Sequence, residues 1–154
     1  MWRLALAILM LVLAACGGPD DTPEAQVRQL IDAMEQAVES GSVKDATGLL
    51  HSDYSDRWHP DRRAAARSLF GYLRRHDNIH LFTLIKSIVV TPSQDAADAV
   101  VYVAMSGTPV DSIEALVSVK ADLYRFDVSL ATLDGDWRVR SARWERATEA
   151  AFSQ

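Results

Sequence analysis

The spacing of apolar residues changes once along this chain, near Asn78, and this change limits the folds that the chain can adopt. From Pro23 to Asn78, apolar residues recur at intervals of three and four, which is typical of amphipathic helices. After it they alternate with other residues, as in strands that bury one face. A chain with its helices first and its strands afterwards predicts an α+β fold, with an antiparallel sheet wrapped over the helices.

Three helices are predicted in the first half. Thr22-Pro23 has the features of an N-cap followed by a first helical residue, and that helix ends at Gly41. Residues 42–45 resemble a capping box with aspartate in place of glutamate, which opens a short second helix. A third helix is predicted over about residues 60–75, with arginines outward and apolar residues inward, namely Ala65, Ala66, Leu69, Phe70, Tyr72 and Leu73.

Four strands are predicted in the second half, from alternation and from the turn residues between them. They cover about residues 78–91, 97–106, 117–132 and 137–144. The stretch from Gly107 to Leu116 is either a loop or a single helical turn. Asp134 and Gly135 predict a tight hairpin between the last two strands.

The first residues have the features of a sorting signal. A positive end, Met1 to Arg3, precedes an apolar run of twelve residues from Leu4 to Ala15. A membrane-spanning helix needs about 20 residues, so the run has the length of a signal-peptide core instead. Its end, Leu13-Ala14-Ala15-Cys16, resembles the lipobox of bacterial lipoproteins. That resemblance implies cleavage before Cys16, a thioether link from Cys16 to diacylglycerol, and acylation of the new amino end. The alternative is an ordinary secretory signal with an incidental cysteine.

The expected location follows from this resemblance. Several acyl chains, at about 0.8 kcal/mol per buried methylene, hold a soluble domain at a bilayer. In Gram-negative lipoproteins an aspartate directly after the cysteine favours the inner membrane, and here Gly17 follows. For a Gram-negative source we therefore expect the periplasmic face of the outer membrane. The expected organisation is a signal peptide over 1–15, the lipidated cysteine and a tether over 16–22, a domain over 23–147, and a tail over 148–154.

Cys16 is the single cysteine, so the chain can form neither an internal disulfide nor a zinc site built from cysteines. The four histidines and the carboxylates show no spacing typical of metal ligands. We therefore expect no metal and no cofactor.

The order of these pieces resembles the nuclear transport factor 2-like superfamily, also called cystatin-like or polyketide-cyclase-like domains, over about residues 24–146. The resemblance rests on a first helix ending in Glu39-Ser40-Gly41-Ser42, on Leu49-Leu50 before Asp53-Tyr54, and on a closing Asp134-Gly135-Asp136-Trp137 hairpin. It implies a strongly curved antiparallel sheet folded around the helices into a cone, often dimeric through the sheet. The open end of the cone would hold a pocket, which some members use for catalysis and many for binding or assembly.

Aromatic residues are the candidates for lining such a pocket, namely Tyr54, Trp58, Phe82, Tyr102 and Tyr124. Alternation in the third strand places Tyr124, Phe126 and Val128 on the core face, and Arg125 and Asp127 on the other. Arg125 and Asp127 are expected to form an ion pair on a solvated or dimeric surface, because a lone charge in an apolar pocket is costly.

The weak catalytic candidates are Asp53, Asp56, His80 and Asp127. Ketosteroid isomerases of this superfamily combine a carboxylate base with a tyrosine from the first helix, but residues 27–38 contain no tyrosine. A structural role in a loop or helix cap is the preferred interpretation of Asp53 and Asp56. A histidine-based dehydratase or cyclase stays open, although no spacing singles out His51, His59 or His80. No nucleophile-elbow or phosphate-loop motif occurs.

One segment is basic although the whole chain has a net charge of −5. Between residues 57 and 77 two aspartates accompany six arginines, namely Arg57, Arg62, Arg63, Arg67, Arg74 and Arg75. The preferred interpretation is a solvated helix face whose arginines pair with acidic neighbours. The alternative is contact with anionic lipid headgroups or an acidic partner. No nucleic acid partner is expected, given the acidic total and the expected location.

Three functions stay open at this point. The preferred one is a non-enzymatic envelope lipoprotein that binds a small apolar ligand or a partner protein. The second is a lipid-anchored isomerase, dehydratase or cyclase using a pocket aspartate or histidine. The third is a structural or assembly role through a dimeric sheet. A deep pocket with a buried, uncapped acid or histidine near a tyrosine would favour the enzyme, and a cone filled by Phe82, Tyr124 and Trp137 would exclude it.

Overall fold

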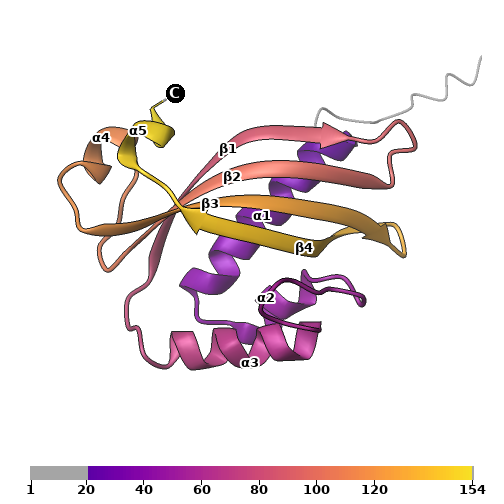
Figure 1. The fold of residues 1–154 in the computed structure, drawn as a ribbon, viewed down its shortest axis with the longest axis horizontal. Helices are drawn as coiled ribbons and strands as arrows, with labels where there is room; N and C mark the ends of the chain where they lie inside the picture. Colours follow the sequence, from indigo (N-terminus) through magenta and orange to yellow (C-terminus); the bar gives the residue numbers. More distant parts are fainter. Residues whose placement is uncertain (1–20, 154) are drawn as a thin grey trace, which may run out of the picture.

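A computed structural model describes residues 21–153 of the chain as three helices, a four-stranded sheet and two short helical turns (Figure 1). The predicted signal peptide, Cys16 and most of the predicted tether lie outside these residues. Among residues 21–153, no helix combines the length and the apolar character needed to cross a bilayer.

The helices before the sheet are α1 (Pro23–Glu39), α2 (Val43–Gly48) and α3 (Arg62–Leu73). Side chains cap the start of each one: Thr22, Ser42 and Asp61 accept hydrogen bonds from the N–H groups three residues later. The first two caps confirm the prediction. The third helix begins later than predicted because Asp61, not Pro60, closes its first turn, with a 2.7 Å bond from the Ala64 N–H.

The sheet consists of β1 (His80–Val90), β2 (Ala96–Ser106), β3 (Ala121–Leu133) and β4 (Asp136–Arg146). Each strand pairs antiparallel with the next, in the order β1-β2-β3-β4. Asp134 and Gly135, with φ of 53° and 86°, form the predicted hairpin between β3 and β4. The third strand starts four residues later than predicted, because a short helix, α4 (Ile113–Leu116), and the turn after it come first.

The sheet is strongly curved, and α1 crosses its concave face (Figure 1). An extra residue interrupts each edge strand, Lys86 in β1 and Arg140 in β4, and such bulges bend and twist a sheet. The helices α2 and α3 lie beside the lower edge of this assembly in Figure 1, with α3 outermost. The predicted α+β fold, with helices inside a curved antiparallel sheet, is therefore confirmed.

Two apolar cores lie on opposite faces of the sheet. The larger one joins α1 to the concave face through Val27, Leu30, Val101, Leu130 and Trp137, with other buried residues. This arrangement confirms the alternation predicted for β3, since Phe126, Val128 and Leu130 all pack on the helix side.

The smaller core lies on the other face and contains Ala104, Leu116 and Phe152. Phe152 belongs to α5 (Glu149–Phe152), within the residues expected to form a tail, and only 1% of its surface is exposed. The end of the described chain is thus part of the folded unit.

Candidate functional site

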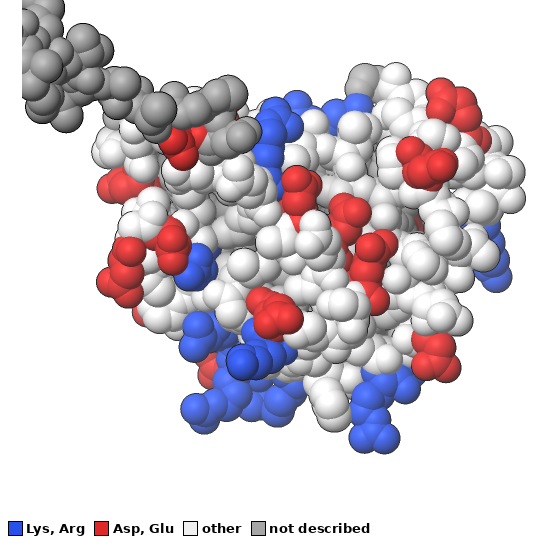
Figure 2. Space-filling view, turned by 180° about the vertical axis from the view of Figure 1, so that it is seen from behind, with Lys and Arg blue, Asp and Glu red and all other residues white. Residues whose placement is uncertain are grey.

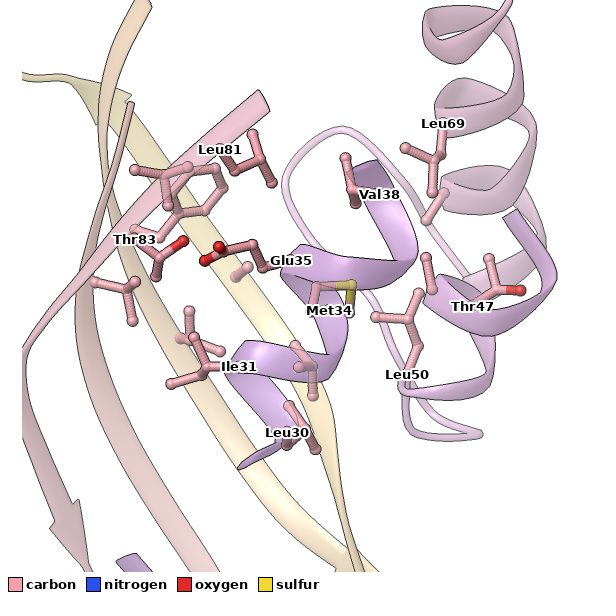
Figure 3. A pocket seen from close by; sticks show the side chains of 18 of the residues that line it. Leu30, Ile31, Met34, Glu35, Val38, Thr47, Leu50, Leu69, Leu81 and Thr83 are labelled. Carbon is pink, nitrogen blue, oxygen red and sulfur yellow. The ribbon is translucent and has the colours of Figure 1, made fainter. Parts of the chain in front are cut away.

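A cavity of about 340 Å³ lies between the helices and the concave face of the sheet (Figure 3). Small-molecule sites in proteins typically enclose about 300–1,000 Å³, so the cavity lies at the lower end of that range. Its apolar walls include Leu30, Ile31, Met34 and Val38 of α1, Ala65 and Leu69 of α3, Val101, Val103 and Met105 of β2, and Phe126 and Val128 of β3. An interior of this composition favours an apolar occupant.

Glu35 is the one carboxylic acid among the described residues that line the cavity. It projects from α1, and its carboxyl group points toward the Thr83 hydroxyl on β1 (Figure 3). Burial raises the pKa of Glu35, the hydrogen bond from Thr83 acts in the opposite direction, and the nearby Glu39 and Asp32 raise the pKa further. A carboxyl group in such surroundings can hold a polar group of a ligand or exchange a proton with it.

Glu35 was not among the residues singled out from the sequence. It lies at the edge of the apolar face of α1, four residues after Ile31 and next to Met34. An acidic residue at that boundary is an ordinary feature of an amphipathic helix. Only the approach of Thr83, from a strand 48 positions later, distinguishes it from the solvated acids of α1.

Asp56, a predicted candidate, is the centre of a closed hydrogen-bond network beside the cavity. The Tyr54 hydroxyl donates to its Oδ2 at 2.5 Å, and the backbone N–H groups of Trp58 and His59 donate to its Oδ1 at 2.7 and 2.9 Å. The Nδ1 of His59 lies 2.8 Å from its Oδ2. Burial alone would raise the pKa of Asp56, but these hydrogen bonds outweigh it and lower the pKa. Asp56 therefore organises the loop between α2 and α3.

The network continues from His59 to α3. The Nε2 of His59 lies 2.9 Å from the Ser68 hydroxyl, so Ser68, His59 and Asp56 are spaced as in a serine-nucleophile triad. Ser68 is inside α3, however, where the backbone N–H groups are used by the helix itself and none is free to stabilise an oxyanion. The chain of bonds thus ties the 54–59 loop to α3.

Of the five aromatic residues expected in a pocket, only Tyr54 lines this cavity. Phe82 and Tyr102 lie instead on the opposite face of the sheet, in the smaller core, where the Tyr102 ring is 5.4 Å from that of Phe152. Tyr124 packs edge-on against Phe126, with ring centres 6.3 Å apart.

Trp58 has 63% of its surface exposed and lies at a second hollow, of about 390 Å³, between the 57–58 segment and the β4 residues 142–145.

The remaining acid and histidine candidates lie away from the cavity. The Asp53 side chain is 75% exposed and lies 3.9 Å from His51 Nδ1. His80 begins β1 and is not a lining residue. Asp127 also borders the second hollow, and its Oδ1 lies 2.9 Å from the Arg125 Nη2, which confirms the predicted ion pair.

The basic segment differs from the preferred expectation. Within residues 21–153, none of its six arginines forms an ion pair with an aspartate or glutamate. Two of the neighbouring acids have other partners: Asp61 caps α3, and Asp56 is bonded to Tyr54 and His59. Figure 2 shows basic side chains gathered along the lower edge of the molecule, where Figure 1 places α3.

The fold has counterparts among solved structures. A protein from Novosphingobium aromaticivorans, provisionally named a scytalone dehydratase, superposes with a TM-score of 0.66 at 10% identity, covering 81% of this chain and 84% of that one. A provisionally named dehydratase of the NTF2-like family from Streptomyces avermitilis superposes with a TM-score of 0.64 at 18% identity, covering 83% and 99%. A domain of unknown function with a cystatin-like fold from Nostoc punctiforme gives 0.66 at 12% identity, covering 82% and 78%.

No protein-family model and no curated protein matches the sequence. The structural likenesses, all at low identity, show that the chain has the cystatin-like, NTF2-like fold.

Proposed function

We propose that this protein binds a small, largely apolar molecule in the cavity between α1, α3 and the sheet. The observation that carries the proposal is the cavity itself, which has apolar walls and a half-buried polar corner formed by Glu35 and Thr83. The three aromatic residues that could have filled the cone leave the cavity open. Phe82 is on the opposite face of the sheet, and Tyr124 does not line the cavity. Trp137 is part of the larger core beside the cavity, where a 3.1 Å bond from Nε1 to Gln26 Oε1 holds its indole.

The polar corner supplies orientation. An apolar wall attracts ligands without fixing their direction, whereas a few polar groups select one end of the ligand. Glu35 and Thr83 are such groups (Figure 3). They suit a ligand that carries one hydrogen-bond donor, a hydroxyl or an amine, at one end of a hydrocarbon body.

Binding of the fluorescent probe N-phenyl-1-naphthylamine tests this proposal. Val103→Phe on β2 places a ring in the cavity and so takes up space that the probe needs. We expect it to weaken probe binding at least about tenfold, which corresponds to about 1.4 kcal/mol. Val100→Phe makes the same change on the same strand but on the face away from the cavity, and is expected to leave binding unchanged.

Leu69→Trp on α3 is a second filling variant, in case Val103→Phe impairs folding. A wild-type protein that does not bind the probe, or folded filling variants that bind it as well as the wild type, would exclude the cavity as the binding site.

A second candidate function is proton transfer on a bound ligand, in an enzyme of the isomerase, dehydratase or cyclase type. The raised pKa of Glu35 in an apolar site favours it, because a general base works best when its pKa lies near the working pH. Two of the structural counterparts are provisionally named dehydratases, which adds a fold-level analogy only.

Deuterium exchange at the α-carbon of 2-tetralone, an apolar ketone, separates this candidate from simple binding. An enzyme would accelerate the exchange, and Glu35→Gln would remove the acceleration while probe binding persisted. Acceleration that survives in Glu35→Gln would show that Glu35 is not the base.

The same proposal includes a lipid anchor at Cys16, which would hold the domain at the periplasmic face of the outer membrane. Its support is the lipobox resemblance at the end of the apolar run. Cys16→Ser is expected to release the chain from the membrane fraction and to abolish labelling by radioactive palmitate. Retention of both properties in the variant would exclude the anchor.

A further inference from the structure

We propose that the outward face of α3 is a docking surface for an acidic protein, with Phe70 as its central contact. Four residues define this surface, which we call the α3 stripe: Arg63, Arg67, Phe70 and Arg74. They follow one another at intervals of four, three and four, so they lie on one side of the helix. All four are exposed. The expectation that Phe70 faces inward is wrong, since 53% of its surface is exposed.

The opposite side of α3 is occupied. Ala65, Leu69 and Tyr72 line the cavity, and Ser68 binds His59. No residue of α3 is buried, which sets it apart from α1 and α2. The helix therefore has one side in contact with the domain and one side with neither apolar cover nor charge compensation.

The arginines of the stripe have no acidic partner within residues 21–153. Within the stripe, the Arg74 guanidinium makes a cation–π contact with Phe70, 5.7 Å from the centre of the ring. An aromatic ring flanked by arginines is a typical composition for the few residues that dominate a protein interface. The stripe thus offers one apolar contact with arginines before and after it along the helix.

The charge of the stripe indicates the chemistry of the partner. Arginines bind carboxylates through two parallel hydrogen bonds, and an apolar hollow with carboxylates on both sides of it would complement both parts of the stripe. The chain as a whole carries −5, so its overall field does not attract an acidic protein and the contact must come from this local surface.

A protein fits the stripe better than a bilayer does. A helix that lies in a membrane interface buries a broad apolar face in the lipid, but the apolar face of α3 is turned into the cavity and only Phe70 points outward. Without an apolar face in the lipid, membrane binding would depend on the arginines, and each contributes only about 1 kcal/mol of binding free energy at an anionic surface.

The proposed anchor at Cys16 gives a second reason to expect a protein at the stripe and not the bilayer. This reason depends on the anchor that is part of the proposed function. The chain from Cys16 to Pro23 spans at most about 25 Å. The 17 residues of α1 add about 25 Å, and α1 begins near the end of β1, across the molecule from α3 (Figure 1). A domain anchored there would present the stripe away from its own membrane.

Photo-crosslinking in the cells that make the full chain tests the inference. Phe70→p-benzoylphenylalanine is expected to capture one protein, through a segment rich in aspartate and glutamate identified by mass spectrometry. Val89→p-benzoylphenylalanine is the matched control, because Val89 is 66% exposed on β1 and lies outside α3. The control is expected not to capture that protein.

Charge reversal separates a specific contact from capture by proximity. Arg63→Glu combined with Arg67→Glu is expected to reduce the crosslink at residue 70 at least about tenfold, whereas Arg28→Glu, an exposed site on α1, leaves it unchanged. Equal urea midpoints for the variants and the wild type would establish that all of them fold.

Four outcomes would overturn the inference. Residue 70 could crosslink to lipid alone, only to a second copy of this chain, or to nothing. In the fourth, a protein is captured but the crosslink yield is unchanged when Arg63 and Arg67 are both replaced by glutamate. None of these outcomes bears on the cavity, since probe binding is measured with the purified protein and does not involve the stripe.

Discussion

Glu35 of α1 and Thr83 of β1 direct their carboxyl and hydroxyl groups toward each other inside the cavity (Figure 3). They are brought together by the crossing of α1 over the concave face of the sheet. The hydroxyl offsets part of the cost of burying the carboxyl group, while the surrounding apolar side chains keep the pKa of Glu35 above its ordinary value. The pair is the polar corner on which the binding proposal depends.

Replacing Glu35 by glutamine should change how stability depends on pH. Because the pKa of Glu35 is raised in the folded protein from 4.5, the native state keeps its proton to higher pH than the unfolded chain does. The stabilisation from this retained proton is present in full below pH 4.5 and is lost as pH rises through the raised pKa. Relative to Glu35→Gln, the wild type should therefore lose unfolding free energy as pH rises from 4 to 7.

Urea unfolding at several pH values measures this difference, and other titrating groups cancel between the two proteins. Glu24→Gln, on the exposed first turn of the same helix, is the control. Its unfolding free energy, compared with that of the wild type, should change less with pH. A difference between wild type and Glu35→Gln that is constant with pH would mean that Glu35 is not desolvated.

Asp56→Asn should destabilise the fold. The Asp56 side chain has no exposed surface, and the substitution removes charged hydrogen bonds from Tyr54 and His59. Hydrogen bonds to charged groups contribute about 1.5–3 kcal/mol, so we expect a loss of about 2–3 kcal/mol. Asp53→Asn, in the same loop but exposed, should change stability by no more than about 0.5 kcal/mol.

The pH dependence of the Asp56 contribution has the opposite sign to that of Glu35. Its pKa is lowered in the folded state, so its stabilisation is present at neutral pH and is lost as pH falls below the ordinary 3.8. Equal urea midpoints for Asp56→Asn and wild type at pH 7 would contradict the role assigned to Asp56.

Phe152→Ala should cost about 3 kcal/mol, the lower part of the range for removing a buried phenylalanine. The ring is almost fully buried among Ala104, Leu116 and Tyr102, and its loss should detach α5 from the sheet. Thermal unfolding measures the cost, with Phe70→Ala as the exposed control, which should stay within about 0.5 kcal/mol of wild type. Similar effects of the two substitutions would argue against the burial of Phe152.

Trp137→Phe should remove the bond that ties β4 to α1. The 3.1 Å bond from Trp137 Nε1 to Gln26 Oε1 is part-buried, and its loss together with the smaller ring should cost about 1–2 kcal/mol. A double-mutant cycle with Gln26→Leu isolates the bond, since the two substitutions should not be additive. Additive effects would mean that the bond contributes nothing to stability.

Local signals in the sequence were enough for the helices and the sheet. The capping residues Thr22 and Ser42, the change of period near Asn78 and the Asp134-Gly135 hairpin all act within a few residues, and the structure confirms each of them. The third helix starts later than predicted for a local reason as well: proline is a good first helical residue and aspartate a good N-cap, and here Asp61 makes the capping bond.

The site could not be predicted in the same way, because its features join distant residues. Glu35 is unusual only beside Thr83, and Tyr102 packs against Phe152 rather than toward a pocket. The expected pairing of arginines with acidic neighbours is wrong; of those neighbours, Asp61 is used as a cap and Asp56 binds Tyr54 and His59. Such competition among partners depends on the folded geometry, which periodicity does not contain.

The helix α3 contains no buried residue, whereas α1 and α2 both contain buried residues, so α3 is the helix of the cavity wall that burial holds least. A partner bound to its outer side and a ligand bound against its inner side would contact the same helix. Thermodynamic linkage then requires reciprocity: whatever factor the partner imposes on ligand affinity, the ligand imposes on partner affinity. Occupation of the cavity by a ligand would thereby change the affinity of α3 for its partner.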